Sequence, residues 1–319
     1  MMDVVALGEL LIDFTCVGKD EDNYPTMAAH PGGAPANLLA ALSKYGGKTA
    51  FFSKVGDDTF GHLLIKTMED LGIDTSGVAV DPQSFTTLAF VTLDEKGDRS
   101  FAFARKPGAD TRICFEELDL KLIDEAKVFH YGTLSLTHEP ARTATQKAVA
   151  YAKSKGKLIT CDPNLRLPLW DDLDTCKDQL LWAISQADVV KISDEEVQFL
   201  FGLDPEQGAD RVLSMGVKLV FVTCGPKGCY YKNAVAAGWT PGLGNIKVVD
   251  TTGAGDIFGG SALWMLLQQD QHPGVLDQAA LQKVTAFACA AAGLSTTRPG
   301  GASSVPSLEE IANAIKKQV

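Results

Sequence analysis

The chain has 319 residues, 45% of them hydrophobic and 22% charged, which suits one large globular domain or one domain with a small excursion. Its formal net charge of -11 repels a polyanionic phosphate backbone and argues against a nucleic-acid partner. No apolar run approaches the ~18 residues that a membrane-spanning helix needs, which argues against a membrane protein.

The cysteines and the first residues bear on the cellular compartment. Seven cysteines, an odd number, are scattered without a C-x-x-C pair, as expected of reduced thiols. The opening MMDVVALGELLIDF contains acidic residues and no basic segment, so it is not a signal peptide. We therefore expect a cytoplasmic protein.

Segments of strand character alternate with helical segments along most of the chain, which favours an α/β fold with a mainly parallel sheet. Each helical segment ends near a glycine that fits a C-cap position. The pattern predicts strands over residues 4–8, 49–56, 126–132, 157–162, 187–193 and 218–225, and helices over residues 35–46, 59–72, 141–156 and 194–202.

Two stretches break this alternation and have the pattern of β-hairpins, at about residues 14–30 and 86–105. In the second, DEKGD (94–98) is the expected turn, and Phe103 and Arg105 lie on the return strand. We interpret both hairpins as a small separate sheet that forms a lid over the strand ends, where doubly wound sheets bind ligands. Ordinary edge hairpins are the alternative.

The stretch DTTGAGD (250–256) lies between a short apolar run and a segment whose apolar residues recur at helical spacing. Gly253, Ala254 and Gly255 can therefore turn several backbone N–H groups toward one point at a helix N-terminus, where phosphate oxygens are favoured. A carboxylate there would repel a phosphate that merely rested on the turn, so Asp256 needs another role. An aspartate beside the turn can accept a proton from a hydroxyl group while a phosphoryl group is passed to it.

Other phosphate-binding motifs do not match. A dinucleotide fingerprint requires G-x-G-x-x-G, whereas the glycines here are Gly253, Gly255 and Gly259, one residue too far apart, which argues against a dehydrogenase. Residues 47–49, GKT, imitate the end of a P-loop, but Leu42 stands where that motif has glycine. A purely structural glycine turn is the alternative that remains.

A second glycine-rich stretch, HPGGAPANLLAAL (30–42), leads into a helical segment. Alone it could be a Gly/Pro turn with an asparagine near a helix start. Together with DTTGAGD it resembles the two signatures of the ribokinase-like, or PfkB-type, sugar kinase family. GELLIDF, DPNLR, SDEE, TCGPKG and RPGGASSVP extend the resemblance from end to end, and within the family the chain is most similar to fructokinases.

The resemblance implies a three-layer α/β/α fold, with a mainly parallel central sheet plus a small β-sheet lid. Residues 1–319 would form a single kinase domain, with the lid strands inserted at the two hairpins. Because lid sheets in this family often pack against one another, the resemblance also implies a homodimer through the lid. The alternative is that the lid covers only the sugar site of its own protomer.

The resemblance also assigns a sugar site. Asp13 and Asn37 resemble the residues that bind sugar hydroxyl groups in the family. Arg105 matches a lid arginine that closes over the sugar and then over the new phosphate. Phe103 either contacts the sugar or belongs to a small lid core. The expected substrate-binding residues are Asp13, Gly32, Gly33, Asn37, Phe103, Arg105, Arg166 and Asp256.

ATP and Mg²⁺ are the implied phosphoryl donor and metal ion. Glu196 matches the acidic end of the family's N-x-x-E element, and one outer-shell carboxylate suffices for Mg²⁺ because this ion keeps several waters. Ser193 stands where the family often has asparagine, and GPKG (225–228) could also be simply the turn of a hairpin. The expected nucleotide-binding residues are Asn164, Ser193, Glu196, Thr223, Gly225, Gly228, Gly253 and Gly255.

A monovalent-cation site is implied near the C-terminus. In the family, side-chain and carbonyl oxygens there hold K⁺, which orders the anion-binding turn from outside the reaction centre. The positions that match are Asp250, Thr252, Ser295, Arg298, Gly300 and Ser304.

We therefore expect an ATP-dependent sugar kinase that converts D-fructose to fructose 6-phosphate, with Asp256 as the base and residues 253–255 as the anion hole. The same chemistry on 2-keto-3-deoxygluconate, ribose or a nucleoside stays open, because one or two lid side chains can change the acceptor. A non-catalytic sugar-binding regulator is the alternative from another class of protein. The intact Asp256 and glycine turn argue against it.

Overall fold

The structure is a computed structural model of the chain, and it describes residues 1–93 and 99–318. Within those ranges no helix combines the length and the apolar character that crossing a membrane requires. The seven cysteines are all free thiols, which confirms that expectation.

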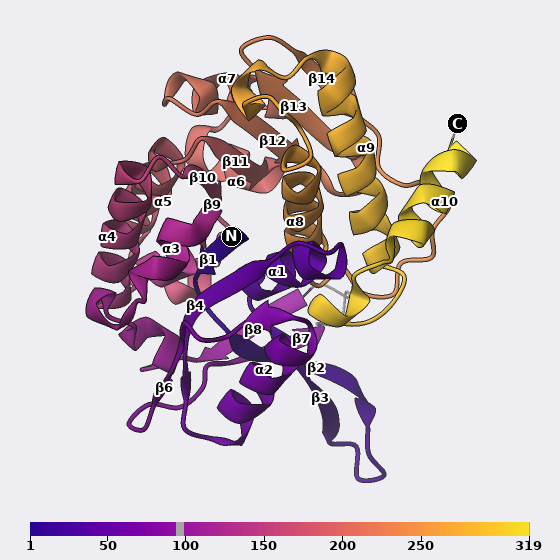
Figure 1. Cartoon of the computed structure of the whole chain (residues 1–319). Helices are drawn as coiled ribbons and strands as arrows, with labels where there is room; N and C mark the ends of the chain where they lie inside the picture. Colours follow the sequence, from indigo (N-terminus) through magenta and orange to yellow (C-terminus); the bar gives the residue numbers. More distant parts are fainter. Residues whose placement is uncertain (94–98, 319) are drawn as a thin grey trace.

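A large, mostly parallel sheet runs through the middle of the molecule (Figure 1). Its strand order is β14-β13-β12-β11-β10-β9-β1-β4-β5, and β6 pairs with β4 outside this path. The hairpin pairs β12-β13 and β13-β14 are antiparallel, whereas the strands from β12 to β5 pair in parallel. The strands are β1 (Met2–Leu7), β4 (Thr49–Gly56), β5 (Ile73–Asp74), β6 (Val78–Asp81), β9 (Ala126–Gly132), β10 (Leu158–Asp162), β11 (Val189–Ser193), β12 (Leu219–Thr223), β13 (Cys229–Asn233) and β14 (Ala237–Thr240).

Helices cover both faces of this sheet and give the predicted three layers (Figure 1). Successive strand residues point to opposite faces, so Val5 and Leu7 join the core beneath α3 to α7, while Val4 and Ala6 join the core beneath α1 and its neighbours. The helices are α1 (Ala34–Lys44), α2 (Thr59–Asp70), α8 (Ala254–Leu266), α9 (Gln278–Ser295) and α10 (Leu308–Gln318) on one face, and α3 (Leu120–Glu125), α4 (Ala141–Ser154), α5 (Leu173–Gln186), α6 (Asp194–Phe201) and α7 (Pro205–Ser214) on the other.

The bounds of the predicted strands and helices agree with the structure to within two residues. The glycines expected at helix ends all have positive φ, which a C-cap favours: Gly46, Gly72, Gly156 and Gly202. Because parallel strands end at the same edge, the segments that follow β1, β10, β11 and β12 begin close together. Four of the motif stretches therefore meet at one edge of the sheet.

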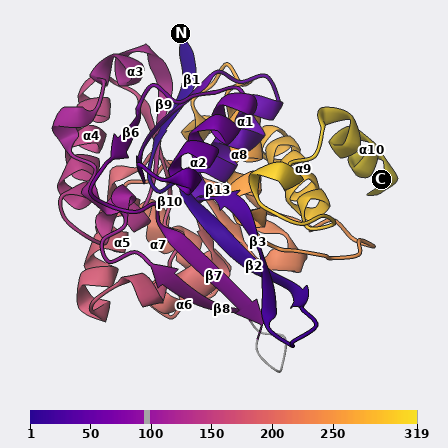
Figure 2. The ribbon, with the colours of Figure 1, turned by 90° about the horizontal axis from the view of Figure 1, so that it is seen from below.

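A small second sheet lies across that edge, formed by the two predicted hairpins (Figure 2). Its strand order is β3-β2-β7-β8, and the parallel pairing of β2 with β7 joins one hairpin to the other. Phe14 stacks on Phe90 across this junction, with ring centroids 5.3 Å apart. The turn expected at residues 94–98 lies outside the described residues. The strands are β2 (Leu11–Lys19), β3 (Pro25–Gly32), β7 (Leu88–Leu93) and β8 (Arg99–Ala104).

Candidate active site

A cavity of about 120 Å³ lies between the lid strands and the carboxyl edge of the large sheet. Its walls come from the end of β1, the first turns of α1 and α8, the segment after β10, and the lid. It therefore brings together both glycine-rich motifs, DPNLR and the lid, as predicted from the sequence. The predicted site residues that line it are Asp13, Gly33, Asn37, Phe103, Asn164, Arg166, Thr252, Gly253 and Asp256.

The DTTGAGD turn forms the N-terminus of α8, which begins at Ala254. Gly253 is the N-cap residue with φ 73°, a left-handed conformation that side chains disfavour. A Cβ at this position would also lie 2.8 Å from the Cα of Gly301. The Ala254 N–H donates to the Thr251 carbonyl oxygen at 3.3 Å, whereas the N–H groups of Gly255 and Asp256 have no acceptor within the helix and suit an anion.

Asp256 joins this turn to the other glycine-rich motif. The amide Nδ2 of Asn37 donates a hydrogen bond to Asp256 Oδ2 at 2.8 Å. Burial raises the pKa of Asp256 to about 6, and the Asp162 carboxylate adds to the rise. Asn37, Lys191 and Arg166 act in the opposite direction. Asp256 is therefore ionised at neutral pH but close enough to titration to accept a proton, as a general base must.

The other end of the Asn37 amide faces no donor. Asn37 is 3% exposed, and its Oδ1 is a buried acceptor without a hydrogen-bond partner in the described part of the chain. A Cβ on Gly301 would overlap this amide, so glycine there leaves it room. Buried acceptors are normally satisfied, so this oxygen, which faces Gly301, is an exception among the described residues.

Asp13 depends on the glycine pair of the other motif. Asp13 lies on β2 and Gly32 ends β3, the strand that pairs with it. A Cβ on Gly32 would overlap Asp13 Oδ2, and Gly33 has φ 115° and a position where a Cβ would overlap the carbonyl oxygen of Glu9. Side chains at these two positions would displace the Asp13 carboxylate or the start of α1. The glycines therefore place Asp13 in the cavity wall.

Asn164 and Arg166 follow β10, and both line the same cavity as Asp13. Asn164 has φ 47°, a left-handed conformation that asparagine tolerates better than most residues. Arg166 donates from Nη1 to the carbonyl oxygen of Leu165 at 2.9 Å. Asn164, predicted as a nucleotide-binding residue, thus lies in the same cavity as the predicted sugar-binding residues.

Glu196 is buried at the start of α6, where both of its carboxylate oxygens accept backbone hydrogen bonds. Oε1 accepts from the Leu165 N–H and Oε2 from the Ser193 N–H, each at 2.7 Å. Ser193 caps the helix in return, since its hydroxyl oxygen accepts from the Glu196 N–H. The remaining lone pairs of Glu196 can hold metal-bound waters, so the residue fits an outer-shell role.

The predicted nucleotide loop lies at the carboxyl end of β12. Thr223 ends this strand, and residues 225–227 form an exposed single turn that leads into the antiparallel β13, so the hairpin interpretation also holds. Gly225 has φ 53° and Gly228 has φ 104°. Thr223, Gly225 and Gly228 do not line the cavity beneath the lid. A nucleotide on them would extend from the α8 N-terminus along the sheet edge.

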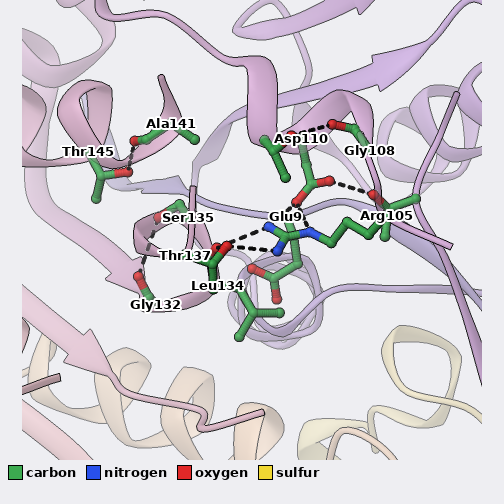
Figure 3. Close-up of polar contacts among 12 residues, drawn as sticks. Glu9, Arg105, Gly108, Asp110, Gly132, Leu134, Ser135, Thr137, Ala141 and Thr145 are labelled. Atoms are coloured by element: carbon green, nitrogen blue, oxygen red, sulfur yellow. Dashed lines mark hydrogen bonds and ion pairs between the residues drawn. The ribbon is translucent and has the colours of Figure 1, made fainter. Parts of the chain in front are cut away.

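Arg105 differs from its prediction as an arginine that closes over the sugar. Its guanidinium group points to Asp110, with Nε and Nη2 donating to Oδ2 at 2.9 and 2.6 Å (Figure 3). Nη1 donates to Thr137 Oγ1, and Nη2 also donates to the Leu134 carbonyl oxygen. Arg105 and Asp110 are 3% and 4% exposed, and neither lines the cavity beneath the lid. A buried carboxylate requires such a partner, so Asp110 holds the arginine at the root of the lid.

Asp250 organises the predicted monovalent-cation set. Its Oδ1 accepts from the Thr252 N–H and hydroxyl group at 2.9 and 2.7 Å, and its Oδ2 accepts from the Gly300 N–H at 3.0 Å. Ser304 lies beside Gly301 and donates to its carbonyl oxygen. This group is rich in oxygen atoms next to the anion-binding turn, which fits K⁺.

Two members of the predicted cation set point elsewhere. The Arg298 side chain pairs with Glu310 at 2.8 Å, and the Ser295 hydroxyl donates to the Ala292 carbonyl within α9. The Arg298 guanidinium group is therefore not a ligand here, whereas the Ser295 hydroxyl oxygen keeps its lone pairs. Among the described residues no cluster of three or more His, Cys, Asp or Glu side chains could hold a metal ion.

Four charged residues near the site were not singled out from the sequence: Glu9, Asp110, Asp162 and Lys191. Glu9 lines the cavity and accepts a hydrogen bond from the Ala34 N–H, and Lys191 forms an ion pair with Asp162 at 3.0 Å. A lysine inside the apolar strand VVKIS was a usable signal, because a charge in a buried strand requires a partner. The identity of that partner depends on the order of the strands in the sheet, which cannot be read from the sequence.

Comparisons with known proteins agree with this geometry. The model of the pfkB family carbohydrate kinases matches residues 1–308. Fructokinase-2 of Solanum lycopersicum is 42% identical over 317 residues, which cover 98% of this chain and 96% of that protein. The crystal structure of a fructokinase with bound ATP from Xylella fastidiosa has a TM-score of 0.91 at 29% identity and covers 100% of this chain and 99% of its own. A double mutant of a Vibrio cholerae fructokinase, bound to fructose, ADP and potassium ion, has a TM-score of 0.88 at 31% identity over 98% of each chain.

Proposed function

The chain belongs to the pfkB family of carbohydrate kinases, and on that premise we propose that it transfers the γ-phosphoryl group of ATP to D-fructose, giving fructose 6-phosphate and ADP. Its activity is that of an ATP-dependent fructokinase. The observation that carries the reaction is the hydrogen bond between Asn37 and Asp256, which places a base and a sugar-binding amide beside an anion-binding helix end in one cavity.

Asp256 is the base in this reaction. Its Oδ2 is occupied by the Asn37 amide, so we assign the hydroxyl proton of the sugar to Oδ1. As the sugar oxygen forms its bond to the γ-phosphorus, the bond from that phosphorus to the β,γ-bridging oxygen breaks and ADP leaves. The N–H groups of Gly253 and Gly255 and the Arg166 guanidinium group stabilise the charge on the phosphoryl oxygens in transit.

The sugar lies in the cavity beneath the lid. Asp13 accepts hydrogen bonds from sugar hydroxyl groups, and Asn37 lines the same cavity. Because Gly33 has no side chain, the cavity wall there is backbone, and the sugar ring can approach it closely. Phe103 covers the sugar from the lid and excludes water, which would otherwise compete as the phosphoryl acceptor.

Glu196 would hold Mg²⁺ through water molecules at the phosphates of ATP, next to the nucleotide loop of Thr223, Gly225 and Gly228. When bound, the metal neutralises charge on the β- and γ-phosphoryl oxygens. Both Glu196 oxygens already accept backbone hydrogen bonds, which supports a contact through water over direct coordination.

We propose K⁺ as the monovalent ion at the Asp250 group. The carboxylate and the Thr252 hydroxyl supply oxygen ligands, and Asp250 already ties the turn before α8 to the backbone at Gly300. A cation there would hold the anion-binding turn from outside the cavity. The potassium ion reported with the Vibrio cholerae fructokinase supports this choice.

Replacing Asp256 by asparagine tests the assignment of the base. We expect turnover to fall by about 10²- to 10⁴-fold because the hydroxyl proton has no acceptor, whereas fructose still binds. Calorimetric titration of the variant with fructose separates binding from chemistry. The exposed Asp270→Asn is the matched control and should keep wild-type turnover. Near-normal turnover by D256N would remove Asp256 from the reaction.

We also propose a homodimer through the lid and a cytoplasmic location. Val17 and Tyr24, near the tip of the β2-β3 hairpin, are 63% and 68% exposed, which supports an apolar contact there. Sedimentation of the wild type and of Val17→Asp tests the dimer, since a monomeric wild type would exclude it. The free thiols support a reducing compartment, and fractionation of the source cells tests that location.

A further inference from the structure

Behind the DTTGAGD turn lies a buried ion pair that the proposed reaction does not use. Asp162 ends β10, Lys191 lies on β11, and these strands pair in parallel with Thr160 opposite Val189 and Cys161 opposite Val190. This register sets Asp162 opposite Lys191. The ammonium nitrogen lies 3.0 and 3.2 Å from the two carboxylate oxygens, and the side chains are 12% and 5% exposed.

The ammonium group of Lys191 packs against the anion-binding turn. A Cβ built on Gly255 would lie 3.0 Å from Lys191 Nζ, so the second glycine of the turn leaves room for this group. Unlike Gly253, Gly255 does not have positive φ, and its backbone would accept a side chain. The close approach of Lys191 thus explains why residue 255 is glycine. The sequence pattern did not predict this contact.

The pair has opposite effects on Asp256. The Asp162 carboxylate disfavours a second negative charge nearby, and the Lys191 ammonium group favours it. The Arg166 guanidinium group also favours the ionised form of Asp256. His130, which also lines the small space beside Lys191, stays neutral because burial, together with Lys191, lowers its pKa to about 3.

We propose that Lys191 is a positioning residue for the phosphoryl transfer: held by Asp162 behind Gly255, its ammonium group keeps Asp256 ionised and backs the turn that receives the phosphoryl group. This inference rests on the proposed function, in which Asp256 accepts the hydroxyl proton. Asp162 moderates the effect of Lys191. Removing either partner alone should therefore shift the ionisation of Asp256, in opposite directions.

The test is the pH profile of kcat/KM for fructose at saturating Mg·ATP, which reports the ionisation of the free enzyme's base. We expect Lys191→Met to move the acid limb up by about one pH unit, because Lys191 then no longer opposes the effect of Asp162 on Asp256. Asp162→Asn should move the limb down. Lys191→Arg keeps the charge and should return the limb toward that of the wild type.

The double variant K191M/D162N removes both buried charges and should leave the acid limb close to that of the wild type. If K191M is too unstable to assay, the inference can still be tested with this double variant and with D162N. A downward shift of the acid limb in D162N alone would support the inference. Thermal unfolding identifies variants that are not folded. Unshifted limbs, or shifts of K191M and D162N in the same direction, would overturn the inference. Wild-type turnover by D256N would instead remove the proposed base itself, so the two failures are distinguishable.

Discussion

Glu9 is a buried carboxyl group in the wall of the sugar cavity, 2% exposed, and its Oε1 accepts a hydrogen bond from the Ala34 N–H at 2.8 Å. Ala34 begins α1, whose N-cap Gly33 has no side chain to offer, so Glu9 caps this helix from a distant part of the chain. Burial raises the pKa of Glu9 to about 7, and the Asp110 carboxylate adds to the rise. Hydrogen bonds from backbone N–H groups and the charge of Arg105 oppose it.

The raised pKa of Glu9 predicts a change of stability with pH. Because the folded chain holds this proton up to about pH 7 and the unfolded chain loses it near 4.5, the free energy of unfolding should fall as the pH rises between these values. Glu9→Gln keeps an acceptor for the Ala34 N–H but does not titrate. Over this window the wild type should lose on the order of 3 kcal/mol relative to the variant.

Urea unfolding of the wild type and E9Q at a series of pH values measures this difference. Other titrating groups, Asp256 included, are present in both proteins and cancel in the comparison. Curves that stay parallel from pH 4.5 to 7 would show that Glu9 titrates normally and that its burial has little effect on its ionisation.

At the scale of elements, β8 is anchored where it leaves the lid. Arg105 follows this strand and pairs with Asp110 in the single turn of residues 109–112, and it also binds Thr137 and Leu134 beyond β9. Phe103, two residues before Arg105, lines the sugar cavity. We propose that the ion pair sets the position of this lid side chain from outside the cavity.

Replacing Arg105 by alanine tests this anchor. The Asp110 carboxylate would remain buried without its partner, and loss of one member of such a pair destabilises a protein by about 3–5 kcal/mol. The fructose KM should rise more than the ATP KM, because Phe103 loses its support. Lys66→Ala, which removes an exposed pair with Asp70, is the control and should leave both quantities unchanged. Equal stability of R105A and K66A would contradict the anchor.

The elements themselves could be predicted because hydrophobic periodicity and glycine C-caps are local signals, and β4 and α2 begin where the pattern placed them. The contacts of Arg105, in contrast, could not be predicted from the sequence. An arginine on a lid strand looks the same in sequence whether it faces a ligand or a buried carboxylate. The choice depends on where the 109–112 turn places Asp110, which is a tertiary contact.

At the scale of the molecule, the parallel order of the large sheet brings motifs from the whole chain to one edge. Asn37 and Asp256 lie far apart in sequence yet share a hydrogen bond, because α1 and α8 pack side by side on one face. The resemblance to a family could predict that these two residues lie in one site, since both glycine-rich motifs can be recognised in the sequence. The contact of Lys191 with Gly255 could not be predicted, because it depends on the register of β10 against β11.

The central claim is that this cavity catalyses phosphoryl transfer from ATP to fructose. The most direct measurement is a coupled assay of ADP release with Mg·ATP and K⁺, run with fructose, ribose, 2-keto-3-deoxygluconate, adenosine and no acceptor. We expect fructose-dependent release well above the other acceptors and above the blank. Release that is greater with another acceptor would contradict the assignment of fructose, and the absence of release with every acceptor would contradict the kinase activity.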